Sequence, residues 1–153
     1  MAFTYDQLKT AIQDYTQNTE TSFVTNLPVF IRSAEERILK TVQLTLFRKN
    51  STGNMTASDE YLIQPTDFLA PFSLSFTDSN NNKQFCDFKS VNFIQEFNPD
   101  RSVTGEPRYY ANFDINSFIL GPTPNSSYAV ELHYYYRPTS LTAGAGSGET
   151  WLS

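Results

Sequence analysis

Apolar and polar residues alternate strictly along residues 128–137 of the chain. The two faces of this segment differ in composition: one holds Tyr128, Val130, Leu132, Tyr134 and Tyr136, and the other holds Ala129, Glu131, His133, Tyr135 and Arg137. A period of two residues is typical of a β-strand that is buried on one side only. The apolar segment 117–121 and a Gly-Pro-Thr-Pro turn come shortly before it. The pattern therefore predicts antiparallel strands in this part of the chain.

Residues 1–43 show the longer period of α-helices instead. Thr4 and Gln7 have the spacing of a capping box, which predicts the start of a first helix. A second helix is predicted from Ser22 or Asn26 to about Val42, with an apolar face that comprises Phe23, Leu27, Phe30, Ile31, Ala34, Ile38 and Val42. Pro28 lies either near the start of this helix, where a missing backbone donor is tolerated, or inside a longer helix that it kinks. The short link predicts an antiparallel helical hairpin.

From residue 44 the period changes to two, and turn-forming residues recur at short intervals. Strands are predicted near 44–49, 54–64, 71–77, 84–88, 108–113, 117–121 and 128–137. A turn that contains Gly53 is predicted at 50–54, and a short helical turn is predicted near 89–97 with Val91, Ile94 and Phe97 facing inward. Short antiparallel strands at this spacing are typical of a small β-sandwich or a curled sheet.

Residues 142–153 begin with a run of Gly, Ala and Ser, which is typical of a flexible linker. The pair Trp151-Leu152 after this run indicates the start of another element, so we expect a C-terminal helical segment that this sequence lacks. The predicted fold class is α+β. The predicted domains are a helical hairpin at 1–43, an antiparallel β-sandwich-like domain at 44–141 with its helical turn near 89–97, and the linker at 142–153.

The charge of the chain limits the classes of partner that it can bind. The 153 residues carry 16 acidic and 11 basic side chains, a net charge of −5, and residues 1–50 are nearly neutral. An acidic protein does not bind nucleic acid tightly through its phosphates. The N-terminus lacks the features of a signal peptide, and no segment is long and apolar enough to span a membrane. We expect synthesis in a reducing cytoplasm and no membrane partner.

Few residues of this chain have the chemistry of a catalytic or metal site. His133 and Glu131 share one strand face, but His133 is the only histidine, and surface decoration explains the pair better than proton transfer. Cys86 is the only cysteine and is best explained as a structural thiol in a strand. The Asn-rich segment 78–82 lacks the glycine and the glutamate of a calcium loop. We therefore predict a protein that is not an enzyme, with no catalytic residues, cofactor or metal.

Four residues are candidates for contacts with other proteins. Arg101 and Arg108 lie in or beside the loop 98–107, which we interpret as a contact between subunits. Tyr135 is predicted to point outward from its strand, and Trp151 is the only tryptophan. Aromatic and arginine side chains are enriched at protein interfaces.

Several segments in this order resemble the head-to-tail adaptor, or connector, proteins of podovirus-like tailed bacteriophages. The matching segments are residues 5–9 (YDQLK), 30–38 (FIRSAEERI), 61–69 (YLIQPTDFL), 118–124 (FILGPTP) and 128–138 (YAVELHYYYRP). The resemblance covers essentially the whole chain. It implies two N-terminal helices and a C-terminal helical part, with a β-rich domain inserted between them, and it supplies no catalytic residues.

The resemblance also implies a function for the chain. Adaptors of this type are virion proteins that form a ring of twelve copies between the portal and the tail nozzle, at the junction of head and tail. The ring continues the DNA channel, through which DNA passes without specific binding, and it often holds the base of the tail fibres. Two alternatives remain open: another tail component such as a nozzle or tube subunit, or a carbohydrate-binding module that recognises the host.

Overall fold

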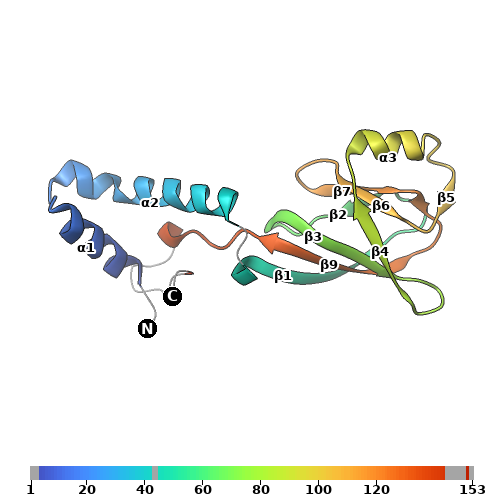
Figure 1. Ribbon diagram of the computed structural model, residues 1–153, viewed down its shortest axis with the longest axis horizontal. Helices are drawn as coiled ribbons and strands as arrows, with labels where there is room; N and C mark the ends of the chain where they lie inside the picture. Colours follow the sequence, from blue (N-terminus) through green and yellow to red (C-terminus); the bar gives the residue numbers. More distant parts are fainter. Residues whose placement is uncertain (1–3, 43–44, 144–150, 152–153) are drawn as a thin grey trace. The chain divides into compact units, whose positions relative to one another are not determined.

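The computed structural model describes residues 4–42, 45–143 and 151, and it has an α+β fold, as predicted (Figure 1). The chain divides into two compact units. The helical unit comprises Met1–Thr45 and Arg137–Ser153, and the β unit comprises Leu46–Tyr136. Most of the predicted linker at 142–153 lies outside the described residues.

Helix α1 runs from Tyr5 to Thr16 and begins at the predicted capping box. The Thr4 hydroxyl accepts a hydrogen bond from the Gln7 amide at 3.2 Å, and the Gln7 side-chain oxygen accepts one from the Thr4 amide at 3.0 Å. These two bonds satisfy backbone donors that the first turn of a helix leaves unpaired. Gln17 caps the C-terminal end of the helix and has a left-handed backbone with φ of 51°.

Helix α2 runs from Thr21 to Thr41, so Pro28 lies within the helix and not in its first turn. Of the two placements that the sequence allowed, the longer helix is the correct one. The buried side of α2 comprises Leu27, Ile31, Glu35 and Leu39, which are spaced four residues apart. Three of these are apolar, and the fourth is a carboxylate that sequence reasoning did not single out.

The core of the helical unit is small. Tyr5, Ile31 and Leu141 are buried together, with Leu8, Ile12 and Trp151 packed against them. Leu141 belongs to the short 3-10 helix η2 (Leu141–Ala143), so the core joins both helices to a segment from the other end of the chain.

The β unit is built around one mixed sheet that is nearly closed. Its strand order is β1-β9-β3-β4-β6-β7-β2. The strand bounds are β1 Arg48–Met55, β2 Tyr61–Ile63, β3 Phe68–Thr77, β4 Lys83–Phe88, β6 Tyr109–Asn112, β7 Ser117–Gly121 and β9 Tyr128–Tyr136. The 3-10 helix η1 (Thr45–Phe47) precedes β1, and a parallel ribbon joins β5 (Thr104–Gly105) to β8 (Thr123–Pro124).

The sheet differs from the sequence prediction in several places: Thr45–Phe47 form a 3-10 helix within the strand predicted near 44–49, and only Tyr61–Ile63 remain of the strand predicted near 54–64 outside β1. The turn predicted at 50–54 is wrong, because β1 continues through it and pairs with β9, with Gly53 opposite Val130. The predicted strands were all antiparallel, whereas β4 and β6 pair in parallel. Helix α3 (Val91–Phe97) connects these two strands, and a connection that contains a helix allows parallel pairing where a tight turn does not.

Helix α3 packs on β6 and β7 (Figure 1). Its Ile94 is 2% exposed and lies against Ala111 and Ile119, as the inward prediction required, whereas Phe97 is 46% exposed. A Cβ atom at Gly121 would lie 2.9 Å from the Ile94 side chain. The helix therefore approaches β7 closely because position 121 has no side chain.

The core of the β unit draws side chains from every strand of the large sheet. Its buried residues are Met55, Leu62, Leu74, Phe76, Cys86, Tyr110, Phe118, Leu120, Tyr128, Val130, Leu132 and Tyr134. The last four come from β9, in the alternation that the sequence predicted. Aromatic rings meet edge to face within this core, for example Phe118 with Phe68 at 5.1 Å and with Tyr110 at 5.5 Å between centroids.

Candidate functional site

The outer face of β9 carries a cluster of polar and charged side chains from different strands. Glu131 lies at its centre, because β9 pairs with β1 on one side and with β3 on the other. The Asn50 side-chain amide of β1 donates to Glu131 Oε1 at 2.6 Å. Lys83 of β4 forms an ion pair with Oε2, and His133 Nε2 lies 3.3 Å from Oε1.

The electrostatics of this cluster fix the charge of Glu131. Hydrogen bonds from Lys83 and then from Asn50 lower the pKa of the Glu131 carboxyl to about 2. A carboxyl group with such a low pKa remains ionised at neutral pH and does not donate a proton there. The Glu131–His133 pair is therefore part of a cross-strand ionic network.

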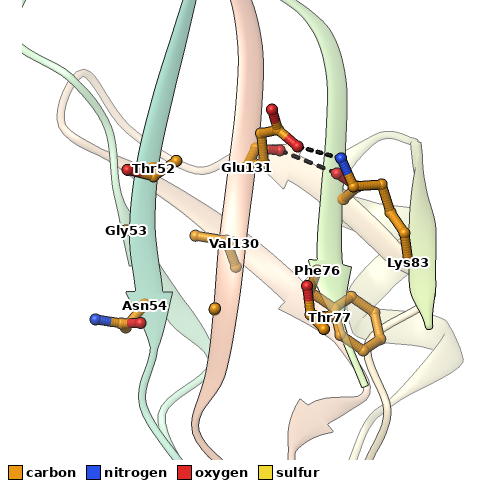
Figure 2. A pocket seen from close by; sticks show the side chains of 10 residues that line it. Thr52, Gly53, Asn54, Phe76, Thr77, Lys83, Val130 and Glu131 are labelled. Carbon is orange, nitrogen blue, oxygen red and sulfur yellow. Dashed lines mark hydrogen bonds and ion pairs between the residues drawn. The ribbon is translucent and has the colours of Figure 1, made fainter. Parts of the chain in front are cut away.

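A shallow depression lies next to this network on the strands β1, β9 and β3, with a volume of about 530 Å³. Figure 2 shows Lys83 and Glu131 reaching toward each other at one side of it. The lining is formed by Thr52, Gly53, Asn54, Ser75, Phe76, Thr77, Lys83, Ala129, Val130 and Glu131. Only one of these side chains is aromatic, and the two charged ones bind each other.

Cys86 lies away from this network, within the core cluster. Burial raises the pKa of its thiol to about 12, so the thiol remains protonated at neutral pH and is a poor nucleophile. Among the described residues, no group of three or more His, Cys, Asp and Glu side chains is arranged to hold a metal ion.

The two predicted contact arginines lie in the β unit and are exposed. Arg101 Nη1 lies 2.8 Å from Oε1 of Glu60, a carboxylate that is itself largely buried. Arg108 is held through its backbone, whose amide donates to the Gly121 carbonyl at 2.9 Å. Their role in contacts between subunits stays a prediction.

The two predicted contact aromatics are less accessible than the arginines. Tyr135 is 6% exposed, with its ring edge to face with Phe72 and its hydroxyl accepting hydrogen bonds from Arg48. Trp151 lies in the helical unit, and its indole Nε1 donates to Glu35 Oε1 at 2.9 Å. The role of both residues in contacts with other proteins stays a prediction.

An apolar groove runs through the helical unit, with a volume of about 320 Å³. Side chains from α1, α2 and the C-terminal segment line it: Leu8, Ile12, Thr16, Phe23, Leu27, Phe30, Ile31, Ala34, Glu35, Ile38, Leu141 and Trp151. Phe30 is 53% exposed although its ring contacts that of Phe23. The groove therefore offers apolar surface of the kind that marks protein interfaces.

A second exposed aromatic cluster lies on α3 and β6. The rings of Phe93 and Phe97 stack on each other at 6.1 Å, and both meet Tyr109 edge to face. Lys89 Nζ lies 5.8 Å from the ring centroids of Phe93 and Tyr109. Sequence reasoning missed this cluster, although Phe93 and Phe97 have the four-residue spacing of one helix face.

Comparison with known proteins decides between the classes of function that these surfaces allow. The family model of the SU10 adaptor protein matches residues 3–153. The chain belongs to the SU10 adaptor protein family. This family comprises phage head-to-tail adaptors, so the adaptor described here is a structural component of a bacteriophage at the head–tail junction. The resemblance that the sequence motifs indicated is confirmed.

Two further findings complete the comparison. Comparison with curated proteins gives no match to this adaptor. Over the part of the chain that the structure describes, no helix has both the length and the hydropathy to cross a bilayer. Adaptors of this family are structural proteins and generally not enzymes.

Proposed function

We propose that this adaptor is a subunit of a ring of twelve copies, assembled between the portal and the tail nozzle from chains made in the host cytoplasm. The observation that carries the proposal is the family match over residues 3–153. The ring continues the DNA channel from head to tail and provides docking sites for the nozzle and for tail fibres.

The helical unit supports the lateral contacts that a ring needs. Its exposed apolar side chains include Val24, Val29 and Phe30 on α2, and Phe30 also lines the groove. An isolated unit with so small a core is poorly stable, and oligomerisation is one common way to cover such surface. We assign the contacts between neighbouring subunits to this unit.

The β unit supports contacts with other tail proteins. The cluster of Phe93, Phe97 and Tyr109 is partly exposed and lies on a regular helix and strand. Aromatic side chains on a rigid scaffold provide large contact area at a low cost in conformational entropy. We assign the docking of nozzle or fibre subunits to this surface.

The net charge of −5 supports passage of DNA without binding. Acidic side chains repeated around a ring produce a negative potential, which keeps the phosphate backbone away from the channel wall. If DNA ejection were unchanged after lysines replaced the acidic residues that face the channel, this part of the proposal would be wrong.

The two alternatives are less well supported. A nozzle or tube subunit would not be expected to match an adaptor family along its whole length. Carbohydrate sites rely on exposed tyrosine or tryptophan, whereas Tyr135 is 6% exposed and the depression of Figure 2 has neither residue in its lining.

The proposal is tested by measuring the mass and symmetry of the adaptor, with and without its portal, by light scattering and negative-stain imaging. A closed ring, or a ring that forms only on the portal, is the expected result. The variant Phe30→Ser should weaken assembly because it removes an exposed ring from α2. Phe85→Ser is the matched control, since Phe85 is 66% exposed in the β unit.

Three results would contradict the proposal. A chain that stays monomeric when mixed with the portal is not an adaptor subunit of this kind. Equal assembly of the Phe30→Ser variant and its parent would show that the helical unit does not form the contact between neighbouring subunits. Loss of assembly only in the Phe85→Ser variant would show that the β unit forms that contact.

A further inference from the structure

Glu35 of α2 is a buried carboxylate that binds one segment of the chain three times. We define the C-terminal arm as Arg137–Ala143 together with Trp151. The Leu141 amide donates to Glu35 Oε1 at 2.8 Å, and the Trp151 indole Nε1 donates to the same oxygen at 2.9 Å. The Ser140 hydroxyl donates to Oε2 at 2.7 Å. Both oxygens of Glu35 are thus bound by the arm.

The three donors explain how a carboxylate can lie on the buried side of α2. Glu35 is 5% exposed, and a buried carboxylate is costly unless hydrogen bonds replace those it makes with water. All three donors are uncharged, and among the described residues the recorded ion pairs of α2 belong to Glu36. Burial of Glu35 and docking of the arm therefore depend on each other.

The neighbouring carboxylate identifies the segment that belongs at this site. Arg137 donates to both oxygens of Glu36, at 2.8 and 3.0 Å. Two consecutive carboxylates of α2 thus bind a guanidinium, a hydroxyl, a backbone amide and an indole of the same arm. A segment from another protein would have to present these four groups at the same spacing.

Docking of the arm also determines how much of the apolar groove is filled. Leu141 and Trp151 both line the groove and pack on the core of Tyr5 and Ile31. Phe30, which also lines the groove, is exposed. Release of the arm would leave Tyr5 and Ile31 without two of their apolar neighbours.

We infer that Glu35 is the receptor group for the chain's own C-terminal arm, and that seating the Trp151 indole on it closes one end of the groove. Glu35 acts as a positioning residue: it sets where the arm lies, while Leu141 and Trp151 supply the apolar contact. This inference does not depend on ring formation, because every group in it belongs to one chain.

Trp151 is the single tryptophan of the 153-residue sequence, so its fluorescence makes the docking of the arm measurable in this chain. The emission maximum of Trp151 and its quenching by acrylamide report how far the indole is shielded from water. We expect Glu35→Ala to lower the ratio of docked to free arm roughly tenfold to a hundredfold, because hydrogen bonds to a charged group are strong. Its emission should shift to the red and its quenching should increase.

Two further variants separate the role of Glu35 from general loss of structure. Glu36→Gln is the matched control, because it weakens the Arg137 contact and leaves the Glu35 donors in place. Its tryptophan quenching should remain close to that of the parent. If Glu35→Ala loses the helical signal in circular dichroism, Ser140→Ala decides the question. That variant removes one donor without changing α2 and should still increase quenching, by a smaller factor.

Three outcomes would overturn the inference. Equal tryptophan quenching in the parent, Glu35→Ala and Ser140→Ala proteins would show that Glu35 does not hold the arm. A larger effect of Glu36→Gln would assign the role to the neighbouring carboxylate. In the Phe30→Ser variant, whose contact between subunits is weakened, quenching that still decreases as the protein concentration rises would show that the arm binds a second copy and not its own chain.

Discussion

The β unit and the helical unit bury their apolar residues to very different degrees. The core of the β unit contains side chains from all seven strands of its nearly closed sheet. Among the described residues of the helical unit, the buried apolar ones are Tyr5, Leu27, Ile31, Leu39 and Leu141, and an apolar groove of about 320 Å³ lies among them. The comparison indicates that the β unit is stable through its own packing, whereas the helical unit depends on the arm and on partners.

The largest effect should come from separating the two units. A fragment of residues 46–136 should fold and unfold cooperatively, because its core lies entirely within that range. A chain that joins residues 1–45 to 137–153 should show weak and gradual unfolding, since a small domain with an open core is marginal. Circular dichroism recorded during denaturation measures how cooperatively each of the two fragments unfolds.

Either of two results would contradict this interpretation of the two units. A β fragment that unfolds without cooperativity would show that its nearly closed sheet is insufficient by itself. A helical fragment that unfolds as sharply as the β fragment would show that the groove does not weaken its core. The parent chain, in which the two units remain joined, is the control.

Truncation of one buried leucine in each unit tests the same difference in packing. Leu74 is 0% exposed in the β core, and Leu27 is 1% exposed beside the groove. Truncation to alanine should cost about 3–5 kcal/mol at Leu74, where a closed cavity remains, and about 2–3 kcal/mol at Leu27, where neighbours can relax. Equal losses at the two positions would contradict the interpretation of the groove as open.

The two units can be followed separately in this experiment. Trp151, in the helical unit, is the only tryptophan, and most tyrosines lie in the β unit. Tryptophan emission therefore reports the unfolding of the helical unit, and near-ultraviolet circular dichroism of tyrosine reports mainly that of the β unit. Separate probes are needed because a chain with two units need not unfold in one step.

The sequence predicted the elements whose signals are local. The capping box at Thr4 and the alternation along 128–136 depend on residues a few positions apart, and both are present in the structure. The middle of strand β1, residues 50–54, was predicted as a turn, because its residues are mostly exposed and it is held by backbone pairing with β9. An exposed polar strand with Asn and Gly has the composition of a turn.

The features that sequence reasoning missed depend on distant residues. The parallel pairing of β4 and β6 follows from where α3 packs, which no local pattern specifies. The donors to Glu35 are Ser140, Leu141 and Trp151, which follow it by more than a hundred residues in the sequence. One signal was available: Glu35 lies four residues after Ile31 and four before Leu39, within the apolar stripe of α2.

The smallest expected effect concerns Glu131, which joins three strands of the β unit. Its folded-state pKa is about 2, below the ordinary value of 4.5, so the ionised form is stabilised by folding. The contribution is complete above pH 4.5 and is lost as the pH falls toward 2. Glu131→Gln should lower the stability of the β unit at pH 7 and weaken its dependence on pH in this window.

The measurement is the urea midpoint of the tyrosine signal at pH 7 and at successively lower pH. Lys83→Met should produce a related change, because loss of the hydrogen bond from Lys83 raises the pKa of Glu131 toward its ordinary value. Glu106→Gln removes an exposed carboxylate of the same unit and serves as the control. The change should be confined to the tyrosine signal. An equal change in the Trp151 signal would show that the helical unit is stabilised by this network as well, and the two units would then not be independent.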